Sequence, residues 1–216
     1  MSVGEAMPGR VLAEAEVWEA RYAAGRDLFG VAPNRFLVEQ LEGLAPARVL
    51  LPGEGEGRNA RWLLAAGHEV CAVDLSATAR DRALAAAGGG DLAERLHYRV
   101  ADVTAVPEDG PFAAPFDVVA LVFVHLPPGQ RRAAHRALAA RLGPGGRVLV
   151  QSFAPAQAGR GGMGPKTPAR LCSPAVLAKD FPGLEVLRAR EVETELEEGP
   201  LHTGPARVVE FVARRP

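Results

Sequence analysis

Three alternating glycines and a later acidic residue are the part of this sequence best suited to bind a ligand. Residues 49–63 read V-L-L-P-G-E-G-E-G-R-N-A-R-W-L, with the glycines between two apolar runs. Such a loop lets the backbone approach a ligand closely. Asp74 follows Gly53 by 21 residues, the spacing at which an acidic side chain bonds ribose hydroxyls. The pair indicates a nucleoside ligand; a structural tight turn and simple helix capping by Asp74 are the alternatives.

The charges of the loop oppose a phosphate group. Glu54 and Glu56 would bring carboxylates toward a dianionic ligand, and Arg58 takes the place of the third glycine of the G-x-G-x-x-G dinucleotide pattern. S-adenosylmethionine (SAM) contains adenosine and ribose without phosphate, and it carries a sulfonium and an ammonium cation. The loop therefore favours SAM, and a nucleotide-cofactor oxidoreductase is the less favoured alternative.

Strand-like and helix-like segments alternate on both sides of this loop. Apolar runs predict strands at 47–51, 69–74, 96–101, 116–123 and 146–153. Helical patterns between them cover about 57–66, 76–87 and 128–142, the last ended by a Gly-Pro-Gly-Gly turn. Continuously apolar strands that alternate with helices predict an α/β fold with a doubly wound, mostly parallel sheet. In such sheets ligands lie beyond the carboxyl ends of the strands, where the glycine loop falls.

The two flanks differ from this alternating core. An amphipathic helix is expected at 11–24 and a second one from Pro33 to Leu41. After a Gly/Pro-rich loop at 154–170, Ser173 should cap a short helix. The last two strands, about 184–196 and 206–213, are too close for a crossover helix and should form an antiparallel hairpin. We expect a single domain, divided into N-terminal lid helices (1–44), a SAM-binding core (45–153) and a substrate loop with the terminal hairpin (154–216).

The stretch L-L-P-G-E-G-E-G-R-N-A-R-W-L-L-A-A-G-H-E-V-C-A-V-D-L-S resembles the SAM-binding half of class I methyltransferases. Within that class, G-E-G-R-N-A and A-A-G-H-E-V resemble the small-molecule branch that includes tellurite-resistance and thiopurine methyltransferases. The resemblance extends from W-E-A-R-Y and F-G-V-A-P-N-R-F-L through V-H-L-P-P and L-G-P-G-G-R-V-L-V to F-A-P-A-Q and E-E-G-P-L-H-T-G. It implies a seven-stranded Rossmann-like sheet with its last strand inserted antiparallel, SAM as cofactor and S-adenosyl-L-homocysteine (SAH) as product.

The resemblance also implies residues that contact the cofactor. Gly53, Gly55 and Gly57 would line the methionine part of SAM, Asp74 would bond the ribose hydroxyls, and Leu75 would lie against the adenine.

Further contacts are implied at the ends of later strands and at the N-terminus. Asp102, flanked by Ala101 and Val103, would accept the adenine amino group, and Val122 and Phe123 would lie under the cofactor. Arg58 and Asn59 would open the helix after the loop, whereas Trp18 and Tyr22 belong to a helix that would close over SAM.

One position departs from the family pattern. Many class I enzymes have an acidic residue two positions before the first loop glycine, where this chain has Leu51 followed by Pro52. Our hypothesis is that Glu54 substitutes as the partner of the SAM ammonium group. The departure also keeps open a catalytically silent SAM-binding module as an alternative function.

Two histidines are candidates for the acceptor side. His125 follows the fourth strand and could be a base or a substrate hydrogen bond, or simply a loop histidine bonded to backbone. His202, in the hairpin turn, could contact the substrate or be a solvated turn residue. A thiol or chalcogen acceptor would need no protein base, whereas an alcohol would. His135 falls on an arginine-rich helix face that we expect to be solvated.

Composition and missing motifs exclude other partners. The chain has 216 residues, 48% of them hydrophobic, and a net charge of -1, which gives no general attraction to nucleic acid or membranes. The fourth strand leads into V-F-V-H-L-P-P rather than an N-P-P-Y-type tetrad, and no carboxylate-rich metal cluster follows it. We therefore expect a cytoplasmic enzyme, monomeric or homodimeric, that acts on a small molecule without a metal.

Overall fold

The computed structural model describes residues 8–160 and 162–216, and the side chains from residue 13 onward. The helices are α1 (Pro8–Ala24), α2 (Arg35–Leu41), α3 (Arg58–Ala65), α4 (Ala77–Ala87), α5 (Asp91–Glu94), α6 (Pro128–Ala140) and α7 (Pro174–Asp180). The strands are β1 (Arg48–Pro52), β2 (Glu69–Asp74), β3 (Leu96–Val100), β4 (Phe116–Val122), β5 (Leu142–Phe153), β6 (Glu185–Glu197) and β7 (Thr203–Arg214). Three short 3-10 turns lie at Gly110–Phe112, Pro155–Gln157 and Pro168–Arg170.

The strands form one seven-stranded sheet in the order β3-β2-β1-β4-β5-β7-β6. Strands β1 to β5 are parallel to one another, and β7 is antiparallel to both β5 and β6. The expected α/β fold and the terminal antiparallel hairpin are both confirmed. Strand order reverses between β1 and β4, so the loop after β1 lies at the point where open α/β sheets bind ligands.

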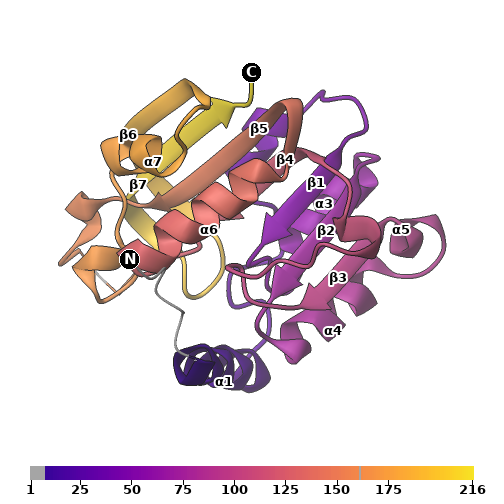
Figure 1. Ribbon diagram of the computed structural model, residues 1–216. Coiled ribbons are helices and arrows are strands. Elements are labelled where there is room, and N and C mark those ends of the chain that lie inside the picture. Colours follow the sequence, from indigo (N-terminus) through magenta and orange to yellow (C-terminus); the bar gives the residue numbers. More distant parts are fainter. Residues whose placement is uncertain (1–7, 161) are drawn as a thin grey trace.

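Side chains of the parallel strands alternate between two hydrophobic layers. Leu50 and Val119 face one layer, which α6 and α7 cover, whereas Leu51 and Ala120 face the other, which α2, α3 and α4 cover. Helices on both faces explain why these strands read as continuous apolar runs. Figure 1 shows α6 along one face of the sheet, and α1 beyond the end toward which the arrows of β1 and β2 point.

Two expected boundaries differ from the structure. Helix α6 ends at Ala140, and β5 already begins at Leu142, so the Gly-Pro-Gly-Gly segment lies within the strand. Leu142 pairs with Phe116, and Gly145 donates its N–H to the Arg215 carbonyl, so neighbouring chain on both sides holds this segment extended. Helix α2 begins at Arg35 rather than Pro33, because the Asn34 side chain accepts from the Leu37 N–H and caps it.

One carboxylate of helix α1 is hydrogen-bonded to the start of α4. Glu19 accepts hydrogen bonds from the Ser76 hydroxyl at 2.6 Å and from the Thr78 hydroxyl and N–H. These bonds lower the pKa of Glu19, so it stays ionised beside the N-terminus of α4. Val17 is 55% exposed and lies outside this contact. Within the described ranges, no helix combines the length and the apolar character needed to cross a membrane.

Candidate functional site

The glycine loop between β1 and α3 has backbone angles that residues other than glycine adopt only with strain. Gly53, Gly55 and Gly57 have φ angles of 74°, 65° and 83°. A Cβ at Gly55 would lie 2.5 Å from the Tyr22 hydroxyl oxygen, and one at Gly57 would lie 2.7 Å from the Ala83 Cβ. The loop thus depends on glycine for its left-handed turns and for the close approach of α1 and α4.

Glu54 caps helix α3. Its carboxylate accepts from the N–H groups of Asn59 and Ala60 at 2.9 and 2.8 Å, and from the Asn59 side-chain amide at 3.0 Å. Burial raises the pKa of Glu54 to about 6, although these hydrogen bonds oppose the increase. The structure gives Glu54 a capping role that the sequence did not suggest. Binding of a ligand ammonium group by Glu54 stays a prediction.

The other two charged residues of the loop are also engaged. Glu56 accepts from the Leu28 N–H at 3.1 Å and pairs with Arg82 at 2.8 Å. Arg58, only 8% exposed, donates to the Phe29 carbonyl at 2.8 Å and pairs with Glu198 at 2.8 Å. Because Arg58 is turned to these partners, it does not offset a phosphate at the loop. This arrangement disfavours a nucleotide cofactor further.

Asp74 lies at the carboxyl end of β2, directly beside the loop. One carboxylate oxygen accepts from the Gly55 N–H at 3.0 Å and the other from the Ser76 N–H at 3.0 Å. Burial raises the pKa of Asp74 to about 6. Each oxygen keeps a further lone pair, which is what two ribose hydroxyl donors require. The site therefore combines a backbone cradle, a diol acceptor and three carboxylates, which fits a cationic nucleoside such as SAM.

The remaining predicted cofactor residues lie at the same edge of the sheet. Asp102 follows β3 and accepts from the Thr104 N–H at 2.6 Å, and Ala101 donates its N–H to the Asp74 carbonyl. Val103 is buried in the core. Leu75 and Val122 are half-buried; Leu75 directly follows β2, and Val122 ends β4. The structure brings these residues to the carboxyl ends of adjacent strands; their contacts with SAM stay predictions.

Aromatic side chains close over the glycine loop. Tyr22 is 3% exposed and its ring lies 5.9 Å from that of Trp18, which in turn lies 6.3 Å from Phe29. A cavity of about 20 Å³ lies between Tyr22, Phe29 and the loop residues. Small-molecule sites typically measure ~300–1,000 Å³. A SAM molecule bound at this loop would therefore need Tyr22 or the whole of α1 to move.

Leu51, at the position where the family has an acid, is 1% exposed and packs in the layer under α2 and α3. It offers no group to a cationic ligand.

On the acceptor side, Phe123 and His125 follow β4. Phe123 has a φ of 55°, unusual for a residue other than glycine, and such backbone strain is concentrated at functional sites. The His125 ring stacks on Phe153 at 5.5 Å, and its Nε2 accepts from the Phe153 N–H at 3.3 Å. Burial lowers the pKa of His125 to about 3 despite a backbone hydrogen bond at Phe123. His125 is thus bonded to backbone, as one of the two alternatives that the sequence left open requires; its role toward an acceptor stays a prediction.

His202 lies inside the structure, not in a solvated turn. It is 6% exposed, and its ring lies 4.6 Å from Phe123 and 5.3 Å from Phe153. Its Nδ1 has no hydrogen-bond partner among the described residues and lies 3.8 Å from a Glu198 carboxylate oxygen.

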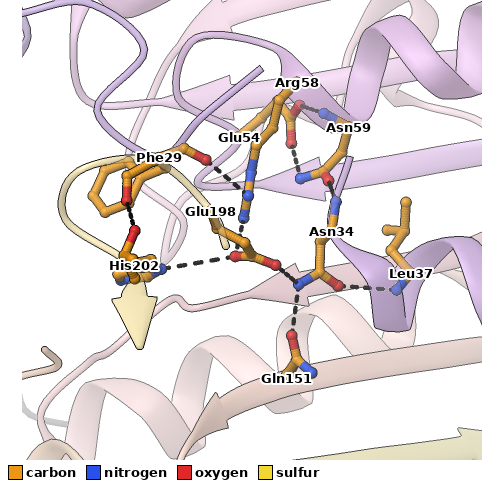
Figure 2. A network of polar contacts seen from close by, with 11 residues as sticks. Phe29, Asn34, Leu37, Glu54, Arg58, Asn59, Gln151, Glu198 and His202 are labelled. Atoms are coloured by element: carbon orange, nitrogen blue, oxygen red, sulfur yellow. Dashed lines mark hydrogen bonds and ion pairs between the residues drawn. The ribbon is translucent and has the colours of Figure 1, made fainter. Parts of the chain in front are cut away.

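Glu198 and Asn34 join three distant segments around this site, as Figure 2 shows. The Asn34 amide donates to Gln151 at 2.6 Å and to Glu198 at 2.7 Å, and the Asn34 N–H donates to the Asn59 side chain at 2.9 Å. Burial would raise the pKa of Glu198, but the nearby His202 ring, the Arg58 ion pair and the Asn34 amide lower it on balance. Sequence reasoning missed Asn34, Gln151 and Glu198, because no local pattern links residues so far apart. Among the described residues, no group of three His, Cys, Asp or Glu side chains could hold a metal ion.

Comparison with protein families places the glycine loop in a known domain. Residues 49–146, from β1 into β5, match the family model of the methyltransferase domain. A search of curated proteins finds no match.

Solved structures share the fold over nearly the whole chain. A protein from a study of how a disulfide becomes a thioacetal in echinomycin biosynthesis has a TM-score of 0.73 and 21% identity, over 93% of this chain and 91% of its own. TehB from Haemophilus influenzae has a TM-score of 0.68 and 16% identity, over 92% of this chain and 67% of its own. The Burkholderia thailandensis 1,6-didemethyltoxoflavin-N1-methyltransferase, crystallised with 1,6-didemethyltoxoflavin and SAH, has a TM-score of 0.69 and 22% identity, over 100% of this chain and 93% of its own.

Proposed function

We propose that the chain is a SAM-dependent methyltransferase that acts on a small molecule, with a thiol or a chalcogen anion derived from selenite or tellurite as the first acceptor to test. When bound, SAM supplies a methyl carbon activated by sulfonium, which an acceptor displaces in line. The main task of the protein is then to hold the acceptor ~3–3.5 Å from that carbon and to exclude water.

The state of His125 is the observation that carries the acceptor class. The Phe153 N–H occupies the lone pair of His125 Nε2, and a pKa lowered to about 3 makes this imidazole a weak base. An acceptor that already carries its negative charge, such as a thiolate, needs no such base. The sulfur chemistry of the echinomycin protein and the likeness to TehB support the same class.

The chain's own residues divide the remaining work. The loop backbone holds the methionine part of SAM, Asp74 bonds the ribose hydroxyls, and Asp102 accepts the adenine amino group. Phe123 and His202 line the approach of the acceptor. Tyr22, carried by α1, closes over the loop and keeps water from the reacting atoms.

Calorimetric titration with SAM, SAH and NADH tests the cofactor. We expect roughly micromolar binding of SAM and SAH and no binding of NADH. Binding of NADH alone would contradict the assignment.

Formation of SAH during incubation with SAM tests the acceptor. The panel sets small thiols, selenite and tellurite against a catechol, and the expected order is thiols and chalcogens first. A His125→Asn variant should retain thiol methylation within a few-fold, whereas a base role predicts a loss of ~10²–10⁴-fold. Because Leu51 offers the SAM ammonium no partner, tight SAM binding without turnover of any acceptor would favour the silent SAM-binding module instead.

A further inference from the structure

A hollow of about 360 Å³ lies between α6 and α7, on the face of the sheet that carries these helices. It is lined by Arg131, Arg132, Arg136, Val176, Lys179 and Asp180. None of these residues belongs to the glycine loop or to the acceptor side, so the α6–α7 hollow is separate from the methyl-transfer site. Its volume falls within the range of small-molecule pockets.

The floor of the hollow is a buried, fully paired unit. Asp180, 2% exposed, accepts from Arg131 Nε at 2.6 Å and lies 3.1 Å from His135 Nδ1. The His135 ring stacks on Phe181 at 4.6 Å, which fixes its orientation. Because Arg131 already neutralises Asp180, this unit adds no net negative charge to the hollow and gives it a rigid base.

The rim is cationic and lacks internal counter-charges. Arg132, Arg136 and Lys179 are exposed, and within residues 8–160 and 162–216 no carboxylate lies within ion-pair distance of any of them. Arg132 and Arg136 are four residues apart on one helix, so they are neighbours on its surface and repel each other. Lys179 faces them from the second helix across the hollow. Three unpaired cations around one concave site create a positive potential that an anion relieves.

We propose that the α6–α7 hollow binds a small phosphorylated molecule through Arg132, Arg136 and Lys179. Guanidinium groups present parallel N–H donors that match two phosphate oxygens, and an ammonium group adds a point charge. A phosphate group alone occupies only part of the volume, so the remainder of the ligand extends over Val176. This inference is independent of the methyl acceptor and of the SAM site.

Pyrophosphate and inorganic phosphate are the probes, titrated by calorimetry at low ionic strength with SAH present and absent. We expect pyrophosphate to bind more tightly than phosphate, with the same affinity whether or not SAH is present. The Arg132→Gln/Arg136→Gln variant should weaken pyrophosphate binding at least tenfold. Both residues are exposed, so the variant should fold, and its circular dichroism spectrum and Tm provide the check.

A matched control removes the same charge elsewhere. Arg147 and Lys166 are exposed and lie outside the hollow, so Arg147→Gln/Lys166→Gln should change pyrophosphate binding less than twofold. If both double variants weakened pyrophosphate binding equally, the effect would depend only on net charge, and the proposal would be overturned. Failure of pyrophosphate to bind the wild-type protein at 10 mM (about a hundred times a Kd of ~0.1 mM) would also overturn it, as would binding of a short oligonucleotide in its place.

Discussion

The buried carboxylate of Asp74 predicts that SAH binding weakens in mild acid. Its pKa is raised from 3.8 to about 6 because the group is 8% exposed beside the glycine loop. A shift of roughly two units corresponds to ~3 kcal/mol for holding the group ionised. Two ribose hydroxyls can both donate only to the ionised form, so at pH 5 the carboxyl must first lose its proton. We therefore expect the Kd of SAH to be about tenfold higher at pH 5 than at pH 7, and constant above pH 7.

Calorimetry in two buffers of different ionisation enthalpy measures this effect directly. At pH 6, SAH binding should release about half a proton, since Asp74 is then half protonated. The Asp74→Asn variant should bind SAH more weakly and lose the part of the pH dependence that Asp74 contributes, whereas Glu54→Gln should keep that part. An affinity that does not change between pH 5 and 8, or an Asp74→Asn variant with the full pH dependence of the wild type, would refute the reasoning.

Three further predictions concern stability. Burial raises the folded-state pKa values of Glu54 and Asp74 to about 6. The stability that these groups contribute is therefore fully present below the pKa values of the unfolded chain and is lost as the pH rises through 6. Urea unfolding between pH 4.5 and 7.5 should show this fall, and the Asp74→Asn and Glu54→Gln variants should each flatten it. Arg58→Met leaves Glu198 buried without its 2.8 Å partner and should cost ~3–5 kcal/mol, against less than ~1 kcal/mol for Arg61→Met on the same helix; equal costs would contradict the role of the pair. Gly199→Ala would place a Cβ 2.2 Å from the Gly30 N and should therefore lower the Tm. The control is Gly183→Ala, where φ is also positive but no atom lies within 4 Å of the added Cβ, so its Tm should fall clearly less. Similar Tm values would show that the hairpin turn does not depend on this contact.

Local pattern and connection length were enough to predict most of the architecture. Continuous apolar strands predicted the buried parallel sheet, and the short link between β6 and β7 predicted their antiparallel pairing. Ser173 caps α7 as expected, because its side chain accepts from the Val176 N–H. These features depend on residues close together in the sequence.

His135 shows where such reasoning fails. The surrounding arginines suggested a solvated helix face, but His135 is 2% exposed and lies against Asp180 and Phe181. The helix turns only part of its arginines outward, and the partner that buries His135 lies 45 positions later in the chain. The same limit applies to the site, where Asn34 and Glu198 meet across 164 positions. Spacing along the chain identified the ligand-binding loop, but not the distant groups that fix it.

The pairing of Arg58 with Glu198 has a consequence for how the protein reaches its working state during synthesis. The two residues are separated by 140 positions, so Arg58 leaves the ribosome long before its partner exists. Until the β6–β7 turn is made and docked, the Arg58 guanidinium group has the Phe29 carbonyl but no carboxylate partner, in a place that later excludes water. A nascent chain can thus form β1 and α3 early, before the glycine loop between them reaches its final conformation. A chain that is incomplete or wrongly folded at this turn should therefore bind the cofactor more weakly than the complete protein.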